Sequence, residues 1–529
     1  MRRKSMRGVI AWATCLALVF PMSLSAQQQA RQVERYEIGE AMPPLDPGKT
    51  LVSMTLDEAI ARALEMNLDI QTYRLNPQMQ EYSLRAAQAA FSPTFSGTYG
   101  YNDATNQSTS QLDGGIQTST LRQTYNASLS QTTPWYGGRL SANFNNNRTE
   151  TNNSFSTLNP SYRSSFSLNY TQPLLSGLKT DNQRTALKTQ EIQGGISDLQ
   201  LTSRVENISN QVRVAYLNLR ALIEQIEIRR RSLAQAQLLL DNNRIRVQLG
   251  SMAEIQVVQA EAQVASAEQA LLNAEVQWRN QELDFKSLLV SGWDDPLLQQ
   301  TLNPTDLPSV EQQEVDIETA IEVALRERTD IRQQRQQRQI SELELAVTKN
   351  NTLPQLNLTA GYSLTGVGGN LYERTGLGGE AQLVEEGGYM DGLSSIWGRD
   401  VPTWNVQLNF SYPIGMRAAK ANHERAQLQI RQTDLALKSQ ELGIVTQVTS
   451  AGLSVNDTFL QLQAARRSRE VAERSAEIEM TRFNVGASTN YEVMQAQDDM
   501  TSARLSELQA IIRHVNAIAE FERVQRVGM

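Results

Sequence analysis

The sequence is poor in the residues that build disulfide frameworks and soft-metal sites, because its 529 residues contain one cysteine and two histidines. Cys15 lies in the N-terminal segment, so the rest of the chain has no thiol with which to form a disulfide. His423 and His514 stand far apart in helical patterns, which favours solvated helix positions over a metal site. The net charge of −8 disfavours nucleic-acid binding, which needs a basic surface. We therefore expect no cofactor, no metal and no nucleic-acid partner.

Long apolar runs are also missing beyond the N-terminus. Residues 1–26 combine four basic residues, an apolar core from Val9 to Phe20 and small residues at 23–26, which predicts a secretory signal peptide. The apolar core is too short to span a bilayer comfortably, which disfavours a membrane anchor. Removal of four positive charges takes the net charge from −8 to −12. Because no apolar run of about 18 residues follows, we expect any membrane crossing to use a closed β-barrel.

The remaining chain carries the same pattern twice. One set of residues recurs 261 positions later, where Ala59, Ala63, Asp69, Pro93 and Tyr101 return as Ala320, Ala324, Asp330, Pro354 and Tyr362. Another set recurs 236 positions later, where Ile208, Val212, Arg246, Gly250 and Val257 return as Ile444, Val448, Arg482, Gly486 and Val493. The difference of 25 positions (261 − 236) falls mostly in Gly/Asn/Ser-rich sequence, where loops tolerate changes of length. Repetition on this scale predicts two copies of one structural unit.

Each copy begins with an amphipathic helix and continues with strands. Thr55 and Glu58 match a capping box, Asp316 is the equivalent N-cap candidate, and Pro93 and Pro354 end the predicted helices. Apolar and polar residues then alternate at 95–101, 162–170, 356–364 and 404–412. Each returning run is about ten residues long, the length that a tilted strand needs to cross a hydrocarbon layer. Soluble β-sandwich strands alternate in the same way, but the signal peptide and the neighbouring helices favour a barrel.

One stretch of the first copy has two interpretations. Residues 121–148 alternate on both sides of a turn at Pro134–Gly138. This pattern indicates either an additional hairpin or one long strand that folds back outside the membrane. The sequence leaves both open.

A very long helix follows the strands of each copy. Leucine, valine, isoleucine and alanine residues from Leu201 to Ile226 are spaced alternately by four and three positions, the heptad pattern of coiled coils. This helix is predicted over about 180–248 and reverses at Gly250, as its counterpart does at Gly486. Both return helices carry alanine at every seventh position, which predicts close helix packing at Ala260, Ala267, Ala274, Ala496, Ala503 and Ala510.

This duplicated order of helix, strands, long helix, turn and return helix resembles the TolC-type outer-membrane efflux proteins. The most specific points of resemblance are the turns at Arg246–Gly250 and Arg482–Gly486, the following Val257–Ala260 and Val493–Ala496, and the strand end at Gln172–Leu174. The resemblance covers the chain from about Leu51 to Val524.

The resemblance implies a fold that is mainly α with membrane β: a trimeric outer-membrane β-barrel continued by a long periplasmic α-helical coiled-coil barrel. Two strands from each copy are too few to close a barrel alone, which also favours a homotrimer. The implied partners are outer-membrane lipid, a periplasmic adaptor that contacts the tip turns, and an inner-membrane pump that is reached through the adaptor. The implied location is the cell outer membrane, with a large periplasmic portion.

The family's tips narrow to an acidic ring in the second copy, six and nine positions after its glycine. Those positions hold Glu492 and Gln495 here, so the expected constriction keeps one of two negative charges. The residues expected at the adaptor-contacting turns are Arg246, Gly250, Arg482 and Gly486. The alternative role for Glu492 is that of an ordinary solvated helix residue.

The expected boundaries follow from the repeats. They are a signal peptide at 1–26, a flexible segment at 27–50, a first repeat at 51–295 with strands at about 94–172, a linker at 296–314, and a second repeat at 315–529 with strands at about 355–412. The expected function is passive conduction of substrates from periplasm to exterior, within a tripartite efflux or type I secretion system. The alternative is a barrel-anchored coiled-coil protein with a structural or adhesive role. An enzyme is not expected, because no nucleophile–base pair, phosphate loop or metal-ligand spacing appears.

Overall fold

The computed structural model describes residues 39–45, 48–109, 115–306, 310, 312–376 and 379–525. The predicted signal peptide, with Cys15, lies outside the described residues. The chain divides into two units, Met1–Ala41 and Met42–Met529. The second unit contains every helix and strand discussed below.

The elements of the second unit occur in the same order in both copies, with additions. The first copy consists of β1 (Leu51–Met54), α1 (Leu56–Met66), α2 (Leu68–Ala89), β2 (Thr94–Gln107), β3 (Gln117–Thr132), β4 (Arg139–Thr151), β5 (Leu158–Pro173), α3 (Asn182–Gln248) and α4 (Ile255–Leu289). Next come the 3₁₀ helix η2 (Pro296–Gln299) and β6 (Thr301–Pro304). The second copy consists of α5 (Ile317–Glu327), α6 (Thr329–Asn350), β7 (Gln355–Arg374), β8 (Ala381–Glu385), α7 (Tyr389–Gly398), β9 (Pro402–Ser411), α8 (Arg417–Asn484) and α9 (Asn490–Gln525).

The opening helix of each copy is broken in two, whereas the periodicity predicts one continuous helix. The break in the first copy falls at Asn67, whose backbone is extended and whose side chain accepts hydrogen bonds from Asp69 N and Ile70 N. Asn67 thus ends α1 and caps α2, as asparagine commonly does because its short side chain competes with the helix for backbone N–H groups. The second copy breaks at the equivalent Arg328, which has no side-chain cap bond. The capping box of Thr55 and Glu58 is formed as predicted.

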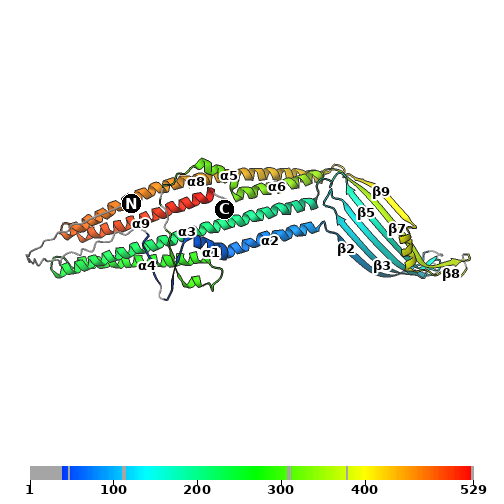
Figure 1. The fold of residues 1–529 in the computed structure, drawn as a ribbon, viewed down its shortest axis with the longest axis horizontal. Helices are drawn as coiled ribbons and strands as arrows, with labels where there is room; N and C mark the ends of the chain where they lie inside the picture. The colour runs from blue at the N-terminus through cyan, green and yellow to red at the C-terminus, as the bar shows by residue number, and fades with distance from the viewer. Residues whose placement is uncertain are drawn as a thin grey trace, which may run out of the picture. The chain divides into compact units, whose positions relative to one another are not determined.

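Two helical hairpins run along the unit, with the strands at the opposite end from the helix reversals (Figure 1). Helices α3 and α4 form one hairpin, and α8 and α9 form the other. The heptad positions Ile208, Val212, Leu219 and Ile226 are fully buried, as the spacing predicts. Of the six alanines for which close packing is predicted, Ala260, Ala274 and Ala510 are buried, whereas Ala267, Ala496 and Ala503 are half-buried. The buried heptad residues therefore form a long packed seam that stabilises the hairpins.

The strands form one sheet in which the first copy supplies four strands and the second copy supplies three. Their order is β2-β3-β4-β5-β7, after which β9 and the short β8 both pair with β7. Residues 121–148 are thus an additional hairpin, β3–β4, paired along its length inside the sheet. The expectation of two strands from each copy is therefore wrong: the first copy supplies four, and the second adds the short β8 to its two long strands. The alternation of apolar and polar residues along the chain does not show which strands pair with each other.

The two faces of this sheet differ in chemistry because successive side chains in a strand point to opposite sides. One row across six strands is apolar and consists of Phe95, Leu129, Ala142, Leu168, Tyr362 and Trp404. The adjacent row on the other face consists of Thr94, Ser130, Ser141, Asn169, Gly361 and Asn405. We call these the apolar face and the polar face. In these rows, the apolar face has the chemistry that suits contact with lipid.

The segment at 296–314, expected to be a linker, is partly ordered against the helices. Its strand β6 pairs in parallel with β1. A buried carboxylate, Glu282 on α4, accepts a hydrogen bond from Leu302 N (2.7 Å) and pairs with the fully buried Lys286 (3.1 Å). The Lys286 ammonium also donates to the Gln300 carbonyl. On α3, the Tyr216 hydroxyl donates to the Met54 carbonyl (3.0 Å), and burial raises its pKa. Buried polar groups therefore fix both short strands to the first hairpin.

Among the helices that the structure describes, none combines the length and the apolar character needed to cross a membrane.

Candidate functional site at the helix reversals

The two helix reversals have the same backbone geometry. In the first, Gly250 N donates to Val247 O (2.9 Å) and Ser251 N donates to Arg246 O (2.9 Å). In the second, the bonds run from Gly486 N to Phe483 O (3.1 Å) and from Ala487 N to Arg482 O (2.8 Å). This is the Schellman arrangement, in which two otherwise unpaired carbonyls at a helix end are satisfied. In both turns, the arginine of the recurring Arg-x-x-x-Gly pattern is thus the helix residue whose backbone carbonyl accepts the outer bond, the one from the residue after the glycine.

Each turn requires glycine for its backbone conformation and not for lack of space. The φ angle is +73° at Gly250 and +77° at Gly486. A Cβ atom at either position would meet no heavy atom within 4 Å. The preceding residues, Leu249 and Val485, are both 76% exposed. Each turn therefore presents one apolar side chain to its surroundings.

Arg246 joins the first turn to the second. Its guanidinium donates to the Phe483 carbonyl (3.2 Å) and to Asn484 Oδ1 (3.3 Å), and it lies 4.4 Å from the centre of the Phe483 ring. Arg482 does not reciprocate this contact. It remains within its own hairpin, where it pairs with Glu479 (2.9 Å) and donates to the Ala487 carbonyl (3.3 Å). The two arginines occupy equivalent positions in the sequence but perform different tasks.

A buried amide pair locks the two tips together. Asn243 Nδ2 on α3 donates to Asn490 Oδ1 at the start of α9 (2.9 Å), and both side chains are buried. Beside them, Leu239, Phe483 and Val493 form a small apolar cluster. Sequence reasoning missed this pair because the two asparagines are not equivalent positions of the repeat, so the repeat pattern gives no signal for it. The tip is consequently one packed unit and not two independent turns.

Glu492 lies in the second tip and caps α9. Its carboxylate accepts hydrogen bonds from Thr489 N (2.8 Å), Ser488 Oγ (2.9 Å) and Thr489 Oγ1 (3.1 Å). In return, Glu492 N donates to Thr489 Oγ1 (3.3 Å), which completes a capping box. These hydrogen bonds, led by the one from the Thr489 backbone, lower the pKa of Glu492. The exposed carboxylate is therefore held in place and ionised at neutral pH.

The first tip has no such cap. Gln256 stands at the position equivalent to Glu492, and Ala253 stands at the position equivalent to Thr489. The structure shows no side-chain cap bond at the start of α4. Only the second copy thus brings a fixed negative charge to its reversal. Gln495, the other expected constriction position, donates to Asp499 (2.9 Å).

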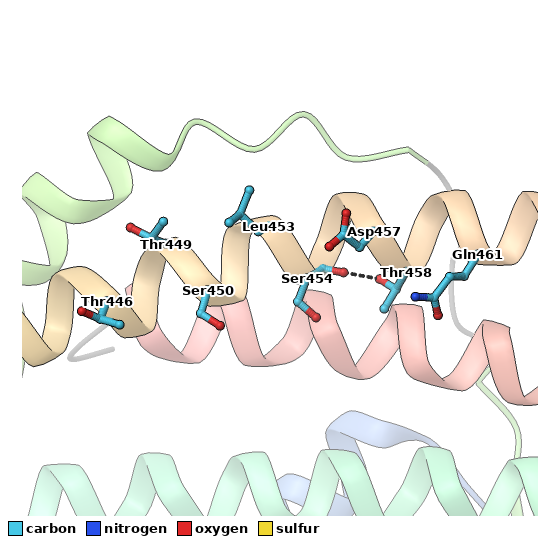
Figure 2. Close-up of a pocket in the computed structure, with 8 residues that line it drawn as sticks. All are labelled: Thr446, Thr449, Ser450, Leu453, Ser454, Asp457, Thr458 and Gln461. Carbon is cyan, nitrogen blue, oxygen red and sulfur yellow. Dashed lines mark hydrogen bonds between the residues drawn. The ribbon is translucent and has the colours of Figure 1, made fainter.

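Farther along α8, hydroxyl and amide side chains line a shallow groove of about 620 Å³ (Figure 2). Its residues are Thr446, Thr449, Ser450, Leu453, Ser454, Asp457, Thr458 and Gln461. The Thr458 hydroxyl donates to the Ser454 carbonyl (2.6 Å). One acidic residue among neutral polar side chains offers no pair for acid–base or nucleophilic chemistry.

The sequence model of a family described as outer membrane efflux protein matches residues 139–289 and 320–519, one stretch in each copy. The matched stretches make up more than half of the chain. This chain belongs to the outer membrane efflux protein family. A comparison with curated protein sequences finds no match.

Solved structures of other membrane proteins share the fold of this outer membrane efflux protein. CusC is 14% identical, with 92% of this chain and 96% of CusC covered and a TM-score of 0.65. VceC of Vibrio cholerae is 13% identical, with coverage of 89% and 96% and a TM-score of 0.62. The open state of MtrE from Neisseria gonorrhoeae is 17% identical, with coverage of 89% and 88% and a TM-score of 0.59. The family membership and this fold confirm the predicted outer-membrane efflux channel component with its duplicated repeat.

The described residues of this efflux protein contain no group of three or more His, Cys, Asp or Glu side chains that could hold a metal ion.

Proposed function

We propose that three copies of this chain close one outer-membrane barrel and one periplasmic helical tunnel. The observation that carries this proposal is the open sheet, in which β2 pairs only with β3 and β9 pairs only with β7. All ten residues of β9 are exposed. An unpaired edge cannot persist in lipid, because each free backbone group there costs several kcal/mol. Pairing of β2 with β9 of the next copy removes both edges, and three copies then close eighteen strands.

Exposed apolar residues along α8 support contact between copies. Leu428, Leu435, Leu442, Leu453, Leu460, Val471 and Ile478 recur at intervals of seven or eleven residues and are each more than half exposed. Intervals of seven and eleven keep side chains on one helix face, since a helix has about 3.6 residues per turn. A continuous apolar stripe of this length is typical of an interaction surface. A neighbouring copy would cover it.

The tips are the proposed contact with a periplasmic adaptor, through which an inner-membrane pump is reached. Both tips present an exposed apolar residue next to a rigid glycine turn, at Leu249 and Val485. Arg246 and Arg482 are held beside these turns by the contacts described above. A repeated surface of this kind suits a partner that binds two equivalent hairpins.

The same tips are the proposed constriction. In a trimer, three Glu492 carboxylates would approach the axis, each held by its capping box. Their lowered pKa would keep them ionised despite mutual repulsion. Such a ring favours cations in transit.

Mass measurement of the purified protein in detergent tests the assembly. We expect a trimer for the parent. Replacement of two exposed stripe residues, in L435E/L442E, should yield monomers that keep their helical content, because the two residues are 67% and 68% exposed in the single chain. The matched variant L435M/L442M keeps an apolar surface of similar volume and should remain trimeric. A parent that is a stable monomer would refute the proposal.

A further inference from the structure

Three arginines stand on the polar face of the sheet. They are Arg122 on β3, Arg139 on β4 and Arg163 on β5, and all three are exposed. Within the described part of the chain, no ion pair joins any of them to a carboxylate. Their charges are therefore not neutralised by the chain that carries them.

The acidic residues of these strands and of the neighbouring β2 lie on the other face. Asp103 is paired with Leu121, and Asn102 is paired with Arg122, so Asp103 and Arg122 point to opposite sides. Glu150 also lies on the apolar face, where it forms an ion pair with Arg148 (2.6 Å). Between the row of Arg139 and the row of Arg122, the polar face carries no acidic residue. The remaining residues there are mainly serine, threonine, asparagine, glutamine and glycine.

Arg122 and Arg163 are close enough for one solute to interact electrostatically with both. Arg122 is paired with Thr149, and Arg163 is paired with Asn147, so the arginines lie two strands apart and two residues apart along the strands. Strand spacings of about 4.8 Å and a rise of about 3.4 Å per residue place their Cα atoms roughly 12 Å apart. Both lie in the half of the sheet far from the long helices, where α7 contacts β5 and β7, whereas Arg139 begins its strand at the end near the long helices.

We propose that the polar face lines the barrel and that Arg122 and Arg163 make its outer half an attraction site for anionic solutes that carry carboxylate, phosphate or sulfate groups. This inference rests on the proposed trimer, in which six guanidinium groups would face one lumen. Guanidinium groups stay charged at physiological pH and match such anions with paired N–H donors. The low-dielectric barrel wall concentrates their field in the lumen. The duct thus carries opposite charges at its two ends, with Glu492 at the tip and arginine in the barrel.

Block of single-channel current in planar bilayers tests this charge arrangement. Tripolyphosphate is added on the side of the strand connections, from which it reaches the barrel before the tip. The parent is compared with R122Q/R163Q, in which the charges are removed, and with R122K/R163K, in which they are kept. The matched control R148Q/E150Q removes one charge of each sign from the opposite face. Trimer formation is verified for each protein by mass.

We expect the half-blocking concentration to rise about tenfold for R122Q/R163Q at roughly 0.1 M KCl, where the Debye length is about 10 Å. The difference should shrink at roughly 1 M KCl, where that length is about 3 Å. R122K/R163K and R148Q/E150Q should be blocked like the parent. Equal block of R122Q/R163Q and the parent would overturn the inference while leaving the channel proposal intact. A parent that forms no trimeric pore would overturn the proposed function itself, and this inference with it.

Discussion

Replacement of either tip glycine by alanine should destabilise the turn by a predictable and local amount. A non-glycine residue in the left-handed region costs about 1–2 kcal/mol. Gly250 and Gly486 adopt this conformation, and an added Cβ would meet nothing within 4 Å at either site. The cost should therefore come from the backbone alone. A change of this size corresponds to roughly a 5- to 30-fold increase in the population of the open turn.

Hydrogen exchange measured by mass spectrometry can detect this opening. The amide N–H groups of Ser251 and Ala487 close the outer Schellman bonds, so their exchange should accelerate about 5- to 30-fold in G250A and G486A respectively. G486N should exchange more slowly than G486A, because asparagine tolerates the left-handed conformation better. Membrane insertion should be retained in all three variants, since the strands lie at the opposite end of the folded unit from the turns (Figure 1).

A third glycine gives a control with the opposite sign. Gly443 lies inside α8, has no positive φ and also has open space around its Cβ position. Alanine there should stabilise the helix by about 1 kcal/mol, because glycine is the poorer helix former. We expect slower exchange of the helix amides in G443A and faster exchange of the turn amide in G486A. Unchanged exchange at Ala487 in G486A, or loss of membrane insertion, would refute the assignment of the turn as a locally strained tip.

Three further outcomes are expected. Glu492→Gln should reduce cation selectivity, measured as the reversal potential in a salt gradient, whereas an unchanged potential would make Glu492 a capping residue only. Lys286→Met should lower the free energy of unfolding by about 3–5 kcal/mol, because Glu282 would remain buried without the lysine that pairs with it. In thermal melts, the double variant E282Q/K286M should recover part of this lost stability. Asn243→Ala should lower the free energy of unfolding by about 1–3 kcal/mol, because the buried Oδ1 atom of Asn490 would lose the donor that Asn243 supplies, and N243L/N490L should cost less; equal losses would exclude the hydrogen bond as the cause.

Local signals in the sequence predicted the elements that depend on neighbouring residues. The capping box at Thr55 and Glu58, the heptads of α3 and the two glycine turns are each determined within a few positions of the chain. Duplication strengthened these predictions, since the same spacing appears twice. The broken helix at Asn67 was missed because an asparagine inside an amphipathic pattern is compatible with both a cap and a continuous helix.

The sequence by itself determined that the chain has two copies of one unit, where its helices reverse, and which strand residues are apolar. Only the tertiary structure decided how distant segments pair. It placed β3–β4 inside the sheet, brought Asn243 against Asn490, and separated Arg122 from Asp103 by the sheet itself. The periodicity of apolar residues indicates on which face of its own helix or strand a residue lies. Pairing between elements depends on shape and charge that folding brings together, across 247 positions in the case of Asn243 and Asn490, and no local pattern records that.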